Sequence, residues 1–154
     1  MGDIEQESIL EQKCIKLLQR AIDYQASDVH VLPRKDYYQL MYRKYGCFQK
    51  VEQIPTELAN RMISYFKFLS SLDISEKRKP QSGAFQQNFY NYDYSFRVST
   101  LPSAYQKESL AIRVLRQNYT LPIDVLCHFS QSAVQLNGLL QQQSGLILVS
   151  GATG

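Results

Sequence analysis

The chain is 154 residues long, 44% hydrophobic, and carries a formal net charge of +3, which fits one compact domain with part of a second. The small charge selects no acidic partner in particular, and three widely spaced cysteines without a Cys-x-x-Cys pair disfavour both a disulfide framework and a zinc site. No signal peptide and no apolar run near the roughly 18 residues that span a bilayer are visible, so we expect a cytoplasmic protein.

The first half of the chain predicts two helices and three strands. Apolar residues spaced by three and four predict a helix that runs to about residue 25. Short strands are expected over 28–32, 38–44 and 47–54, the last two joined by a tight turn. A second amphipathic helix is expected to begin at Thr56, whose hydroxyl would cap it.

The next stretch predicts a loop and three more strands. Residues 74–83 are too charged, and too interrupted by proline and glycine, for the interior of an element. Alternating residues then predict a hairpin over 85–90 and 94–101 and a further strand over 108–115. The whole pattern indicates an α+β domain with one antiparallel sheet.

The character of the sequence changes after residue 116. Residues 117–129 resemble a linker, and residues 130–143 predict a helix that ends before a glycine. Four consecutive apolar residues, 146–149, follow without alternation. This pattern is typical of a strand buried on both faces of a parallel sheet, so we expect the first strand of a second domain.

Glycine-rich residues follow that expected strand. A phosphate-binding loop has the form Gly-x4-Gly-Lys-Ser/Thr between a buried strand and a helix, because glycines let backbone N–H groups turn toward phosphate oxygens. A plain turn would also accommodate Gly-Ala-Thr-Gly, but the preceding strand favours the phosphate loop. The candidate cofactor-binding residues are Gly151, Ala152, Thr153 and Gly154.

Five stretches carry a resemblance to a known family. They are residues 26–30, 72–83, 96–102, 108–115 and 145–154. In this order they resemble the traffic ATPases of type II secretion and type IV pili. The end of the second expected helix, 66–69, and the stretch 108–113 look most similar to the competence branch of this family in Gram-positive bacteria. That branch powers the pseudopilus used in DNA uptake.

The resemblance implies a domain organisation, cofactors and partners. Residues 1–116 would form a PAS-like N-terminal domain, 117–129 a linker, and 130–154 the first helix and strand of a RecA-like ATPase domain, truncated within the Walker A loop. The full-length protein would be a hexamer that uses ATP and Mg²⁺ and works with an inner-membrane pilus platform protein. It would lie at the cytoplasmic face of the membrane. From the residues themselves we expect no transmembrane segment, and direct nucleic-acid binding, which 11 tyrosines and 7 phenylalanines could suggest, is disfavoured because most of these aromatic residues fall on buried stripes.

The resemblance also implies two catalytic residues. Arg97 and Arg113 match the arginines that the N-terminal domain brings to the nucleotide phosphates, and the alternation places both on the face opposite the apolar residues of their strands. Such an arginine can contribute roughly 10³–10⁵ to the rate of phosphoryl transfer. The alternative is that either arginine only pairs with a carboxylate such as Glu108. No metal ligand is predicted in this part, and the 154 residues alone are expected to be inactive.

Other interpretations stay open. The chain could be a stand-alone PAS-like sensor or adaptor, in which case residues 146–149 would fold back onto the first domain. We expect Asp28 and His30 to make a structural hydrogen bond and not to take part in catalysis. Arg78 and Arg116 are weaker candidates for nucleotide contacts.

Overall fold

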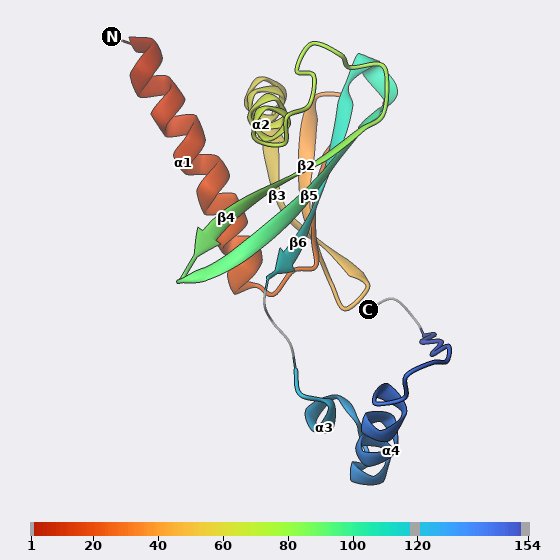
Figure 1. The fold of residues 1–154 in the computed structure, drawn as a ribbon. Helices are drawn as coiled ribbons and strands as arrows, with labels where there is room; N and C mark the ends of the chain where they lie inside the picture. Colours follow the sequence, from red (N-terminus) through yellow and green to blue (C-terminus); the bar gives the residue numbers. More distant parts are fainter. Residues whose placement is uncertain (1, 118–120, 152–154) are drawn as a thin grey trace. The chain divides into compact units, whose positions relative to one another are not determined.

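The chain divides after Gln117 into two compact units. The computed structural model describes residues 2–117 and 121–151. Figure 1 shows a helix-and-sheet unit followed by a smaller helical unit. The two units are described separately below.

The first unit is built on one six-stranded antiparallel sheet. Its strand order is β3-β2-β1-β6-β5-β4, so two three-stranded meanders join edge to edge through β1 and β6. The strands are β1 (Asp28–Pro33), β2 (Tyr37–Lys44), β3 (Cys47–Pro55), β4 (Gln81–Phe89), β5 (Tyr92–Pro102) and β6 (Glu108–Arg116). The predicted α+β class with an antiparallel sheet is therefore confirmed, whereas the likeness to PAS domains stays a prediction.

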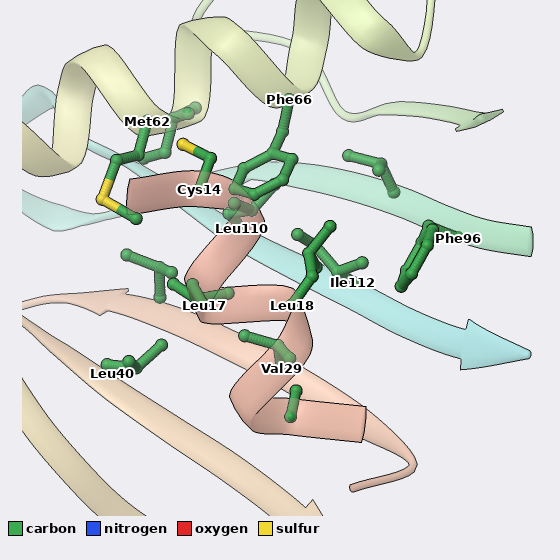
Figure 2. Packing of buried hydrophobic residues seen from close by; sticks show 14 of the residues in the cluster. Cys14, Leu17, Leu18, Val29, Leu40, Met62, Phe66, Phe96, Leu110 and Ile112 are labelled. Carbon is green, nitrogen blue, oxygen red and sulfur yellow. The ribbon is translucent and has the colours of Figure 1, made fainter. Parts of the chain in front are cut away.

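Two helices, α1 (Gly2–Asp23) and α2 (Thr56–Leu69), supply the other half of the core. Figure 2 shows their apolar side chains packed over one face of the sheet. The residues labelled there that belong to the buried cluster are Cys14, Leu17, Leu18, Val29, Leu40, Met62, Phe66, Phe96, Leu110 and Ile112. We call this side of the sheet the covered face and the opposite side the open face.

Two tight turns set the register of the hairpins. Tyr45 and Gly46 have φ of 49° and 77°, and Tyr90 and Asn91 have φ of 54° and 64°. Positive φ at both central residues is what a type I′ turn requires, and its twist matches that of paired strands. The turn predicted at Tyr45 and Gly46 is confirmed, although a tyrosine at positive φ is unusual.

A charged pair lies inside the core. The Lys67 side chain on α2 is 1% exposed, and its Nζ lies 2.9 Å from Oε1 of Glu108, whose side chain is 6% exposed. The same Nζ donates a hydrogen bond of 2.6 Å to the carbonyl of Glu76. Lys67 thus ties α2 to β6 and to the loop that follows α2.

Two local predictions for this unit are wrong. Thr56 is the first residue of α2 and does not cap it, because Pro55 occupies the N-cap position. Its hydroxyl instead donates to the carbonyl of Asp36. Residues 81–83, expected in a loop, begin β4, where Gly83 lies so close to α2 that a Cβ would stand 2.5 Å from the carbonyl oxygen of Ser70.

The second unit contains a helical turn, α3 (Ile123–Leu126), and a helix, α4 (Ser130–Leu140). The expected linker 117–129 therefore holds a short helix, and α4 ends three residues before position 143. Residues 146–149 form no strand and are exposed, with Val149 94% exposed. A strand needs a neighbour to pair its backbone groups, and no described strand pairs with this segment.

Candidate functional site

Four charged residues form a row across the open face of the sheet. Asp28 on β1 lies opposite Arg43 on β2 and opposite Arg113 on β6, and Arg113 lies opposite Arg97 on β5. Most of their neighbours along the strands are buried in the core, namely Val29, Tyr42, Phe96, Val98 and Ile112. Since side chains alternate between faces, these four point the other way. We call them the arginine row.

Asp28 is the centre of this row. Its Oδ1 accepts a hydrogen bond of 3.0 Å from Nε of Arg113, and its Oδ2 accepts one of 2.9 Å from the Ser27 hydroxyl. Oδ2 also lies 3.9 Å from Nη1 of Arg43. Burial raises the pKa of this carboxyl, but the hydrogen bonds from Arg113 and Ser27 and the nearby positive charge outweigh it and hold the pKa below its usual value. Asp28 is therefore ionised at neutral pH.

Arg97 is the unpaired member of the row. Its side chain is exposed and makes no hydrogen bond or ion pair with the described residues. With Asp28, Ser99, Ala111 and Arg113 it lines a cavity of about 200 Å³. Sites for whole small ligands usually enclose about 300–1,000 Å³, so this cavity is too small for a whole nucleotide but suits one anionic group.

The electrostatics of the row favour an anion. The row contains three guanidinium groups and one carboxylate, so its net charge is positive. Arg97 and Arg113 are direct cross-strand neighbours. Like charges directly opposite each other destabilise a sheet. Guanidinium groups also donate in a planar fork that matches phosphate oxygens. A bound anion would relieve the repulsion and use both forks.

His30 and Phe48 flank the row on the same face. Their ring centroids are 5.0 Å apart, and Cζ of Arg43 lies 5.7 Å from the centroid of the Phe48 ring. Burial lowers the pKa of His30 and the neighbouring arginines lower it further, while Asp28 acts in the opposite direction. The imidazole is therefore neutral at pH 7, and its buried Nε2 has no hydrogen-bond partner among the described residues. No described group is placed to exchange a proton with Nε2 of His30.

The structure brings together the two arginines singled out in the sequence, but not with the expected carboxylate. Glu108 lies on the covered face and pairs with Lys67, so it is not the partner of either arginine, although Arg113 does pair with a carboxylate on the sheet, as the alternative interpretation allowed. Arg113 pairs with Asp28, which had been expected to make only a structural hydrogen bond. Arg43 was not singled out, because its link to Asp28 depends on the pairing of β1 with β2.

The other candidates lie apart from the row. Gly151 belongs to the second unit and is exposed outside any helix or strand, and Ala152, Thr153 and Gly154 lie outside the described residues. Cζ of Arg116 lies 3.6 Å from the centroid of the Tyr92 ring.

A larger cavity of about 750 Å³ lies elsewhere, and Arg78 is among its lining residues. The loop after α2 and the turn between β5 and β6 form it. No residue of the arginine row lines it.

In the part of the chain that the structure describes, no three histidine, cysteine or acidic side chains come together as a metal site. Within residues 2–117 and 121–151, no helix is long and apolar enough to cross a bilayer.

The fold and its charged row define an α+β module with an anion-attracting open face, joined to a second unit. The family described as Type II/IV secretion system protein matches residues 3–154. The chain therefore belongs to this family.

Several relatives show which members the chain is similar to. It is 36% identical over 146 residues to competence protein ComGA of Bacillus subtilis and 38% identical over 140 residues to the ComGA of Halalkalibacterium halodurans. These alignments cover 94% and 90% of this chain but 40% of each relative. It is also 34% identical over 141 residues to the type IV pilus assembly ATPase PilB of Pseudomonas aeruginosa, covering 90% of this chain and 25% of that protein.

Proposed function

We propose that this chain is the N-terminal part of a hexameric motor ATPase that drives pseudopilus assembly for competence DNA uptake. In this proposal residues 1–116 form the domain that closes on the nucleotide, and residues 130–154 begin the RecA-like ATPase domain. The protein would act at the cytoplasmic face of the membrane together with the pilus platform protein. The similarity to two ComGA proteins supports the competence assignment.

The observation that carries the proposal is the direct opposition of Arg97 and Arg113 on the open face. Both side chains are exposed, and the cavity between them has the size for a phosphate group. ATP, when bound with Mg²⁺, supplies the phosphoryl group that is transferred to water. The two arginines would bind phosphate oxygens and stabilise the negative charge that spreads over them during transfer.

Gly151 would contribute from the second unit. It would open the phosphate loop, where nothing lies within 4 Å of the position that a Cβ would occupy, so its backbone is accessible to a ligand. The rest of this loop, through Ala152, Thr153 and Gly154, would lead to the lysine and the hydroxyl that bind phosphate and Mg²⁺. The exposed segment 146–149 would then pair within the parallel sheet of the ATPase domain.

The sheet also bears on the stand-alone sensor hypothesis. That hypothesis expects residues 146–149 to fold back onto the first domain. The described sheet contains β1 to β6 only, all between residues 28 and 116. Residues 146–149 therefore add no strand to this sheet, and we propose that they pair within the ATPase domain of the full-length protein.

The test measures Mg²⁺-dependent ATP turnover by the full-length protein. We expect Arg97→Ala and Arg113→Ala each to lower kcat by about 10³-fold while the melting temperature stays near that of the wild type. Arg61→Ala serves as the matched control, because Arg61 is exposed on α2, which packs on the covered face. The 154-residue chain serves as the blank and is expected to be inactive. Unchanged kcat in both variants would refute the assigned role.

A second experiment tests the biological role. Deleting the gene should abolish uptake of transforming DNA, and the wild-type gene, but not the Arg97→Ala gene, should restore it. If the deletion strain still takes up DNA and instead fails to secrete a protein or to build a pilus, the competence assignment is wrong.

A further inference from the structure

We propose that Asp28 is a positioning residue for Arg113: it holds Nε of the guanidinium so that both terminal nitrogens are presented to the phosphate. This inference rests on the proposed function. It adds a second kind of residue to the site, one that acts through Arg113 without touching the nucleotide.

The atoms that meet are the basis of the inference. Arg113 donates to Asp28 through Nε at 3.0 Å, and a guanidinium has five N–H donors, four of them on the two terminal nitrogens. Those terminal nitrogens make no hydrogen bond with any described residue, and the Arg113 side chain is 58% exposed. The carboxylate of Asp28 therefore binds the Nε–H group of Arg113. The four N–H groups on the two terminal nitrogens stay in solvent, where they can bind a phosphate.

Hydrogen bonds from the residue next to Asp28 to both neighbouring strands fix the position of Asp28 in the sheet. Its neighbour Ser27 donates its backbone N–H to the carbonyl of Arg43 at 2.8 Å and accepts from the N–H of Val114 at 3.0 Å. The Ser27 hydroxyl then donates to Asp28. Because hydrogen bonds to both neighbouring strands fix the backbone at this point, the carboxylate stands on a rigid support, as a group that must orient another requires.

The negative charge of Asp28 also helps to keep the Arg113 guanidinium in position. Its carboxylate offsets part of the repulsion between Arg113 and the Arg97 that lies opposite. Arg43 contributes a second cation on the other side of the carboxylate. The low pKa of Asp28 keeps this charge in place at neutral pH.

A purely structural role for Asp28 is the competing explanation. In that case losing the carboxylate would lower the stability of the sheet and leave catalysis by the folded enzyme intact. The two explanations differ in the conformation of the Arg113 side chain and in the coupling between the two residues.

The first experiment examines the 154-residue chain by NMR. In the wild type, we expect the Nε–Hε signal of Arg113 to be shifted and protected from exchange, and that of Arg97 to exchange rapidly. In Asp28→Asn, which keeps the size of the side chain but loses its charge, the Arg113 signal should move toward that of Arg97. An Arg113 signal identical in both proteins would overturn the inference.

The second experiment measures kcat and KM of the full-length protein. A displacement of about 1 Å can lower the rate roughly 10²-fold, so we expect Asp28→Asn and Asp28→Ala to lower kcat by about that factor. In an Arg113→Ala background the same changes should have no further effect, since acting through one residue makes the losses non-additive. Fully additive losses, or normal kcat in Asp28→Asn, would overturn the inference.

The outcomes separate this inference from the proposed function. If Arg113→Ala lowers kcat and Asp28→Asn does not, only the positioning role fails. If Arg113→Ala itself leaves kcat unchanged, the proposed function of Arg113 fails and the positioning role falls with it.

Discussion

The buried pair of Lys67 and Glu108 offers the sharpest test of the fold. Replacing Lys67 with methionine keeps a long, unbranched side chain but removes the ammonium group. Glu108 would then be a buried carboxylate whose Oε1 has lost the donor that lies 2.9 Å away. The carbonyl of Glu76 would lose the same donor.

The expected loss follows from the burial of both groups. Their side chains are 1% and 6% exposed, so water cannot replace the lost partner. Breaking a buried ion pair by removing one member costs about 3–5 kcal/mol. With a urea m-value of about 2 kcal/mol/M, the unfolding midpoint should fall by about 2 M. Replacing both charges, in Lys67→Met/Glu108→Leu, should restore much of the stability, because no buried charge then lacks a partner.

The assay is urea unfolding of the 154-residue chain followed by circular dichroism. Lys16→Met is the matched control, because Lys16 is exposed on α1 and surface changes of this kind stay within about 0.5 kcal/mol. A loss below about 1 kcal/mol for Lys67→Met, or a double variant with the summed losses of both single variants, would refute the reasoning.

Two further predictions concern the same unit. Gly83→Ala should lower the free energy of unfolding by about 1–3 kcal/mol, because the new Cβ would stand 2.5 Å from the carbonyl oxygen of Ser70. The control is Gly138→Ala on α4 of the second unit, where nothing lies within 4 Å of the new Cβ; it should leave the unfolding of the first unit unchanged in the same urea titration. The folded-state pKa of His30 is lowered from 6.5, so the unfolded chain binds the proton more readily. Its contribution to stability is full above pH 6.5 and is lost as the pH falls through the folded-state value. Urea midpoints measured between pH 7.5 and 5 should fall for the wild type and fall less for His30→Gln; equal slopes would contradict this.

The arginine row shows a local rule broken at the candidate site. Directly opposed Arg97 and Arg113 destabilise an isolated sheet, and a hydrophobic or polar pair would serve the fold better. Such conflicts are expected where function takes precedence over stability. If the arginine row binds phosphate groups, a polyanion should therefore raise the melting temperature of the 154-residue chain.

Much of the first unit was predictable from local patterns. Period-two alternation on β5 and β6 placed Phe96 and Ile112 inward and Arg97 and Arg113 outward, as the structure has them. Lys67 escaped prediction because its stripe on α2 is otherwise apolar, and a lysine there would normally extend its charge to solvent. Its burial depends on Glu108, which lies 41 residues away in sequence.

Spacing along the chain was enough to predict the α+β class and the faces on which the residues of β5 and β6 lie, and the family followed from the resemblance of five stretches. Only the tertiary structure decided that β1 lies beside β6, which brings Asp28 to Arg113 across 85 residues of sequence. Strand pairing over such a distance leaves no mark in local alternation. The same holds for residues 146–149: their apolar character predicted a buried strand, but a strand exists only where a neighbour supplies its hydrogen bonds.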